Sequence, residues 1–145
     1  MNREIKFRGW DKRDLTMKDV ASIWFKFTEG SDWISLADDE RGLTKSEDVV
    51  LVQYTGLVDK NGVDIFEDDI VRISDETQDN VFIVSFGKHV ADWHTGEDDG
   101  AITSLGFYLK NRHGDSEVFV NNLLDDIDKV EVVGNIYENP ELIEK

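Results

Sequence analysis

The sequence predicts a mainly β protein with a small barrel in its C-terminal part. Short segments alternate between apolar and polar residues, clusters of turn-forming residues separate them, and no segment shows a long helical period. The chain has 145 residues, of which 39% are hydrophobic and 10% aromatic, so it carries enough apolar surface for a folded core. We expect a β-rich N-terminal region over residues 1–58 and a barrel domain over residues 59–145.

The first 32 residues are typical of strands joined by turns. Residues 5–8 (IKFR) alternate as in a half-buried strand, and residues 11–14 (DKRD) supply a turn before the apolar positions at 15–17. A hairpin is therefore expected. A third strand is predicted over residues 23–27, ending at the turn formers of residues 29–32.

The middle of the chain contains a loop, a strand and a tight turn. Residues 36–42 (LADDERG) are too short for a trusted helix, so a loop is expected. Residues 48–55 are rich in β-branched and aromatic side chains, which predicts a strand covered on both faces. Asn61 and Gly62 form the commonest pair for the positive φ angles of a tight hairpin turn.

Several short strands follow, as in a small barrel. They are predicted over residues 70–73, 81–86, 105–109 and 130–136. One helical turn is expected within residues 121–127, where apolar positions share a helical spacing. Near the end, Asn139 is predicted to cap a short helix that begins at Pro140.

The net charge of −16 is distributed unevenly. Residues 1–30 carry +2 and the remaining residues carry −18. Such an acidic surface repels phosphate backbones and anionic lipid, so no nucleic acid and no membrane are expected as partners. The sequence shows no membrane span, no secretory signal and no cysteine, which favours a cytoplasmic location.

Two acidic clusters are candidates for metal or acid–base chemistry. The first is Glu67–Asp69 with Asp59 and Asp64, but a calcium loop starting at Asp59 would place Val63 and Ile70 at ligand positions. We instead expect a carboxylate, most plausibly that of Asp69, to accept backbone N–H groups.

The second acidic cluster lies at residues 96–100, close to His89 and His94. These two histidines fall on opposite faces of a strand, so we expect no metal site there. The sequence also contains no phosphate loop, nucleotide fingerprint or nucleophile elbow. We therefore expect a protein that is not an enzyme and binds no cofactor.

Three blocks of the sequence resemble the YopX family of small proteins encoded by bacteriophages and prophages. They are Arg3–Asp11 (REIKFRGWD), Gln53–Val71 (QYTGLVDKNGVDIFEDDIV) and Val133–Leu142 (VGNIYENPEL). The resemblance implies an SH3-like, partly open barrel that opens with Asp69, and a location in the bacterial host cytoplasm, but it implies no activity. Within the blocks, we interpret Gly62, Asp69, Asn135, Asn139 and Pro140 as structural. Asp68 stands where the family usually has glycine, so a less tight turn is expected there.

The N-terminal block interleaves basic and aromatic residues, a pattern that can grip an acidic partner. The candidate interaction surface comprises Arg3, Lys6, Arg8, Trp10 and Arg13. Because most of the chain is acidic, this surface could pair with the acidic barrel of the same chain or of another copy.

Three functions remain open. The first is a non-enzymatic protein-interaction or self-assembly module, whose partner is a host or phage protein or, in a homo-oligomer, another copy of itself. Trp10, Trp24 and Trp33 are its candidate anchors. The second is an acidic decoy that mimics DNA and occupies a host DNA-binding protein. The third, a metal enzyme, would use Asp64, Glu67 and Asp69.

Overall fold

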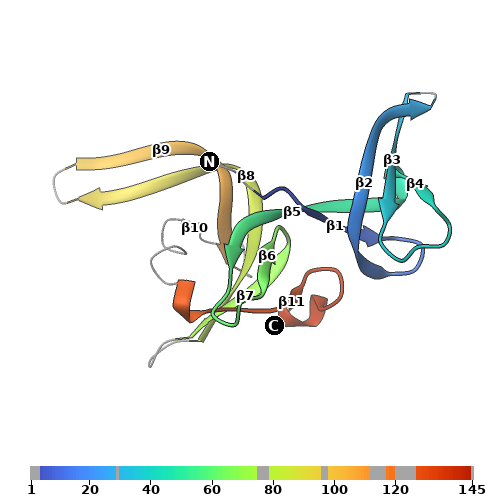
Figure 1. Cartoon of the computed structure of the whole chain (residues 1–145). Helices are drawn as coiled ribbons and strands as arrows, with labels where there is room; N and C mark the ends of the chain where they lie inside the picture. Colours follow the sequence, from blue (N-terminus) through green and yellow to red (C-terminus); the bar gives the residue numbers. More distant parts are fainter. Residues whose placement is uncertain are drawn as a thin grey trace. The chain divides into compact units, whose positions relative to one another are not determined.

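The computed structural model of the chain describes residues 4–28, 30–74, 79–95, 98–111, 117–119 and 127–144. The fold is mainly β, with two antiparallel sheets, as the sequence predicts (Figure 1). The chain divides into two compact units, unit 1 over Met1–Gly56 and unit 2 over Leu57–Lys145. The boundary expected from the sequence lies after residue 58.

The strands of unit 1 belong to a sheet with the order β4-β3-β2-β1-β5-β6. The last residues of β5 and the whole of β6 already belong to unit 2. The elements up to β5 are β1 (Phe7–Asp11), β2 (Thr16–Thr28), β3 (Ser31–Leu36), β4 (Leu43–Lys45), the 3-10 helix η1 (Ser46–Asp48) and β5 (Val49–Val58).

The first hairpin forms where the sequence predicts it. β1 pairs with β2 across the turn at residues 12–15. The prediction of a separate third strand over residues 23–27 is wrong, because β2 continues through these residues to Thr28. No glycine or proline interrupts this strand, and β-bulges absorb its irregularities. β2 and β3 then meet at the predicted turn, where Gly30 has φ +75°.

The sequence analysis missed β3 and β4. In β3, Ile34 and Leu36 are buried and alternate with half-buried residues, and they form the core of unit 1 with Val49. Gly9 of β1 lies against this core, because a Cβ atom there would come within 2.7 Å of Val49 Cγ1 and 2.9 Å of Leu36 Cδ2. No larger side chain fits at residue 9 without movement of its neighbours.

The predicted loop and the strand after it are present. Residues 37–42 form turns without a helix. In β5, Val52 and Tyr54 are buried, whereas Val50 and Leu51 are half-buried. Val49, on the face of Leu51, is buried as well, so both faces of the strand are at least partly covered up to Thr55, as predicted.

Unit 2 contains a second sheet with the order β10-β9-β8-β7-β11. All four strands predicted after residue 69 are present. The elements are β6 (Asp64–Phe66), β7 (Asp69–Ser74), β8 (Asp79–Thr95), β9 (Asp98–Asn111), β10 (Glu117–Phe119), η2 (Ile127–Lys129), β11 (Val130–Asn135) and η3 (Pro140–Leu142). Strands β8 and β9 are longer than predicted and form a hairpin that extends past the rest of this sheet (Figure 1).

The core of unit 2 is a cluster of six buried apolar residues on β6 to β9 and β11. These are Ile65, Val71, Phe82, Val84, Leu109 and Val130. The core thus joins strands of the second sheet to β6 of the first sheet. This arrangement is consistent with the SH3-like barrel, which itself stays an expectation. The helical turn predicted within residues 121–127 lies outside the described residues, except for Ile127. Within the described ranges, no helix is long and apolar enough to cross a membrane.

Candidate interaction surface

The predicted basic surface is largely engaged within unit 1. Arg3 lies outside the described residues. Lys6 Nζ lies 3.2 Å from a carboxylate oxygen of Glu4 and 4.4 Å from the centre of the Tyr54 ring. Arg8 and Trp10 are half-buried in β1, which lies between β2 and β5. Residues 4–13 therefore do not form an open basic face.

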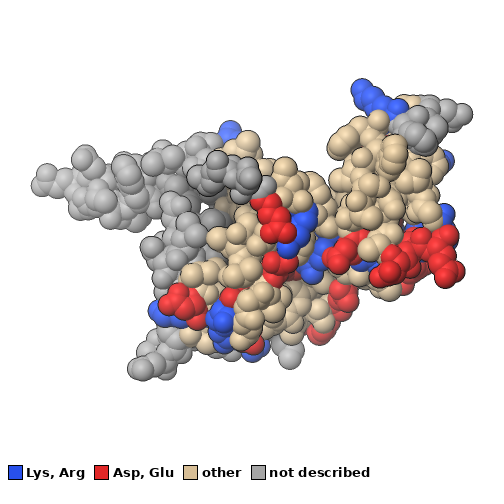
Figure 2. Space-filling view, in the orientation of Figure 1, with Lys and Arg blue, Asp and Glu red and all other residues tan. Residues whose placement is uncertain are grey.

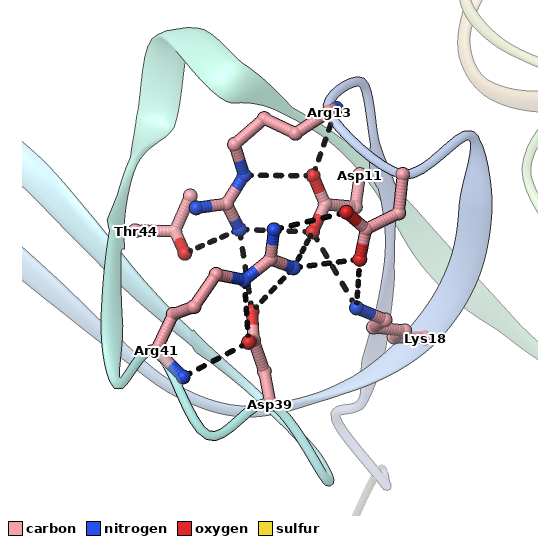
Figure 3. Close-up of polar contacts among 7 residues, drawn as sticks. Asp11, Arg13, Lys18, Asp39, Arg41 and Thr44 are labelled. Carbon is pink, nitrogen blue, oxygen red and sulfur yellow. Dashed lines mark hydrogen bonds and ion pairs between the residues drawn. The ribbon is translucent and has the colours of Figure 1, made fainter.

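Arg13 belongs to a network of ion pairs around the buried side chain of Asp11 (Figure 3). The Asp11 side chain is 0% exposed. Arg13 Nε donates to Asp11 Oδ1 at 2.9 Å, and Nη2 donates to Asp11 Oδ2 at 2.8 Å and to Thr44 Oγ1 at 2.9 Å. The guanidinium thus joins the β1–β2 turn to β4.

A second arginine, which the sequence analysis did not single out, completes the network. Arg41 Nη2 donates to Asp11 Oδ2 at 2.8 Å and to Asp14 Oδ2 at 2.7 Å, while its Nε donates to Asp39 Oδ1 at 2.8 Å. Lys18 Nζ lies 2.8 Å from Asp14. Three cations therefore balance three carboxylates, and they tie the β3–β4 loop to the first hairpin.

The network keeps its carboxylates ionised. Hydrogen bonds from the Arg13 side chain hold the pKa of Asp11 far below its ordinary value, in spite of burial. Hydrogen bonds from the Arg41 side chain lower the pKa of Asp39 to about 2, and those from Arg41 and Lys18 lower the pKa of Asp14. At neutral pH these groups neutralise one another, so the network offers little charge to a partner.

Two adjacent aromatic side chains are exposed at the other end of unit 1. Trp24 is 47% exposed and Phe25 is 75% exposed. Both lie where β2 bulges against β3, since Trp24 pairs with Trp33 and the register shifts before Thr28. This aromatic pair on the β2–β3 hairpin is called the hairpin surface below.

The bulge is held in place by one carboxylate. Lys26 has φ +49°, a left-handed conformation that non-glycine residues rarely adopt, and its N–H donates to Asp32 Oδ1 at 2.9 Å. A bulge bends its strand and can redirect side chains. We therefore interpret Asp32 as the residue that positions Phe25.

On unit 1, most of the described acidic side chains lie away from the hairpin surface. Among the described residues on the face that Figure 2 shows, uncharged and basic atoms lie at the β2–β3 end, whereas the acidic side chains gather near the β1–β2 turn and the β3–β4 loop. An open depression there is lined by Leu36 and by the acidic residues Asp38, Asp39 and Glu40.

The acidic cluster Glu67–Asp69 does not present three exposed carboxylates. Asp69 is buried and accepts the N–H of Phe66 at 2.8 Å, the kind of contact expected for it. Asp68 Oδ2 accepts the Tyr137 hydroxyl at 2.5 Å. Asp68 has φ +64°, so it keeps the left-handed turn that glycine would make, and the less tight turn expected there is wrong.

The Asp59–Gly62 turn is organised by the Asp59 carboxylate. Oδ1 accepts the N–H groups of Asn61 and Val63, and Oδ2 accepts the N–H of Val132 on β11 at 2.9 Å. Burial opposes the charge of Asp59, but these three backbone hydrogen bonds outweigh it and lower its pKa. Only Gly62 in this pair has a positive φ, +78°, so the expectation that Asn61 shares this conformation is wrong.

The closing block is likewise structural. Asn135 is buried, and its Oδ1 accepts the N–H groups of Tyr137 and Glu138. Pro140 begins η3 as predicted, but Asn139 makes no side-chain capping bond. Its Oδ1 instead accepts the N–H of Asn135, and it lies so close to Gly134 that a Cβ atom there would clash with it.

No group of three His, Asp or Glu side chains that could hold a metal ion occurs among the residues that the structure describes. The side chains of His89 and His94 lie outside the described part. Of the remaining acidic clusters, residues 75–78, 96–97 and 125–126 lie outside it as well.

These features define a class of acidic, mainly β, two-unit proteins in which the polar side chains of the sequence blocks bind backbone amides. The family model for YopX protein matches residues 6–144, and the chain belongs to the YopX family.

A solved structure is similar over almost the whole length. The crystal structure of protein EF1440 from Enterococcus faecalis matches with a TM-score of 0.56 and 24% sequence identity, covering 99% of this chain and 100% of that chain. At this identity the likeness shows the fold alone. A comparison with curated proteins gives no match.

Proposed function

We propose that this protein is a non-enzymatic protein-interaction module of phage or prophage origin, acting in the bacterial cytoplasm through the hairpin surface. One observation carries the proposal: Trp24 and Phe25 are adjacent and exposed on a bulge that Asp32 holds in place. Tryptophan is enriched among the residues that dominate binding energy. Bulges and left-handed non-glycine residues also cluster at functional sites.

Site-specific photo-crosslinking tests the proposal. Benzoylphenylalanine is placed at Phe25, and as a matched control at Leu105, which is also 75% exposed but belongs to unit 2. Irradiation of bacteria should give a discrete adduct from position 25 and none from position 105. Equal adduct patterns at both positions, or none at either, would contradict the proposal.

A second candidate is the acidic decoy, and the charge of unit 2 favours it. Unit 2 contains seven Lys/Arg and 21 Asp/Glu, a net charge of −14, against nine and eleven, or −2, in unit 1. Mimicry needs exposed carboxylates along one face, to which Glu67–Asp69 contributes little because Asp69 is buried. A decoy would compete with DNA for a basic protein and would lose this ability when unit 2 carboxylates are neutralised. The Phe25→Ala substitution would leave this competition with DNA unchanged.

A further inference from the structure

We infer that the hairpin surface binds a second copy of the chain, and that the two copies meet unit 1 to unit 1 across Trp24 and Phe25. This inference rests on the proposed function and names its partner. It follows from how charge and apolar surface are distributed between the two units.

Charge limits how two identical copies can approach. Each copy carries −16 in total, of which unit 2 holds −14 and unit 1 holds −2. Contact between two copies of unit 2 brings the largest like charges together, and contact between two copies of unit 1 brings the smallest. Self-association is therefore least opposed when unit 1 faces unit 1.

Within unit 1, Asp32 is the one acidic residue that the structure describes in β2 from Trp24 onward and in β3 up to Trp33. At the opposite end, the ion network pairs Asp11, Asp14 and Asp39 with basic side chains. The exposed residues Asp38 and Glu40 lie outside these pairs and line the open depression. At the hairpin end, the Asp32 carboxylate accepts a backbone N–H, and Lys45 Nζ lies 5.9 Å from the Trp33 ring centre. The described residues of two such surfaces can therefore approach without bringing acidic clusters together.

The chemistry of the surface suits a symmetric contact. Most homo-oligomers are closed and twofold, so each residue of the contact patch meets the same patch on the partner. Aromatic side chains satisfy this requirement because two rings can stack offset or edge to face. Burial of Trp24 and Phe25 from both copies would remove four exposed aromatic side chains from water.

The direction of the salt effect separates this contact from the basic-to-acidic pairing expected from residues 3–13. Salt screens the repulsion between two chains of −16, so an apolar contact strengthens as salt rises. A contact between basic and acidic surfaces weakens instead. Arg13, one member of that basic surface, is already bound to Asp11 and Thr44.

Sedimentation equilibrium of the purified full chain tests the inference. At about 0.1 M and 1 M NaCl, where the Debye length is about 10 Å and 3 Å, the wild type should show a monomer–dimer equilibrium that shifts toward dimer at high salt. Trp24→Ala and Phe25→Ala should each lower the association constant about tenfold or more. Asp32→Ala should lower it less, and Leu105→Ala should leave it unchanged. Circular dichroism checks that each variant is folded.

The outcomes that overturn the inference are distinct. A dimer that weakens with salt would indicate charge pairing, and an equal loss in Leu105→Ala would place the contact in unit 2. A wild type that stays monomeric while position 25 crosslinks a different protein in cells would refute the second copy and leave the proposed function intact. A monomer without any crosslink at position 25 would refute both.

Discussion

At the scale of single residues, the carboxylate of one turn residue accepts hydrogen bonds from several backbone N–H groups. Asp59 accepts the N–H groups of Asn61, Val63 and Val132, and the last of these lies on β11, at the edge of the second sheet. An exposed strand edge can pair with other chains, and a covered edge cannot. The turn therefore both reverses the chain and protects the sheet.

Gly62 closes this turn with φ +78°, and no neighbouring atom would touch a Cβ placed there. Gly62→Val should therefore lower the free energy of unfolding by about 1–3 kcal/mol through backbone strain alone. Gly106→Val is the matched control, because Gly106 also has open space but no left-handed φ. Urea denaturation compares the two, and an unchanged stability of Gly62→Val would contradict the assignment.

Tyr137 and Asp68 form a second contact at residue scale. Burial raises the pKa of the Tyr137 hydroxyl, and the hydrogen bond to Asp68 raises it further. Because the pKa of Tyr137 is higher in the folded state than its ordinary value of 10.0, this stabilisation is complete below pH 10 and is lost as the pH rises further. Tyr137→Phe should cost about 1–2 kcal/mol near neutral pH. The difference from the wild type should shrink above pH 10 in urea denaturation, and a constant difference would refute the contact.

At the scale of elements, the ion network joins three segments of unit 1. It connects the β1–β2 turn, the β3–β4 loop and β4 through Arg13 and Arg41. The loop has no regular structure, so its position depends on these side chains.

Arg41→Ala should therefore destabilise unit 1 in a pH-dependent way. The pKa of Asp39 is depressed from 3.8 to about 2, so its pairing contributes stability above about pH 4 that is lost as the pH falls toward 2. The stability difference between wild type and Arg41→Ala should be largest above pH 4 and should decrease below it.

Lys12→Ala is a suitable control for this prediction. Lys12 Nζ donates to the Glu47 carbonyl, a backbone group that does not titrate. Tryptophan fluorescence in acid titrations follows both variants, because Trp10, Trp24 and Trp33 all lie in unit 1. The same pH profile in the two variants would show that the carboxylates of the network are not responsible.

The sequence allowed β7, β8, β9 and β11 of unit 2 to be predicted, because each contains an apolar run between turn formers. It did not allow β6 and β10 to be predicted, since each has only three residues. β3 was also missed, since this strand begins at Ser31, within the turn formers of residues 29–32. Without β3, Arg41 could not be placed beside Asp11, which lies 30 residues earlier. The exposure of Phe25 was also hidden, because an alternating strand pattern does not reveal a bulge.

At the scale of the whole molecule, the two units differ in how they respond to salt. Unit 2 carries −14, and like charges destabilise a compact state, so screening should stabilise it. Unit 1 carries −2 and relies on ion pairs, which salt weakens slightly. Amide hydrogen exchange of the Phe25→Ala variant, in which the inferred dimer is weakened, should show greater protection of β7 at about 1 M than at about 0.1 M NaCl and little change in β3. Equal gains in both would contradict this prediction.

The hydrogen bond between Val132 and Asp59 joins residues far apart in the sequence, and this affects how the protein folds during synthesis. Val132 follows Asp59 by 73 residues, so a ribosome must add most of unit 2 before the turn can bind it. Closing so long a segment costs more chain entropy than closing a hairpin. The strand pairs of unit 1, in contrast, are available once about residue 56 has emerged. Pulse proteolysis of stalled nascent chains should therefore find unit 1 protected first, and unit 2 protected only in chains that extend beyond Val132.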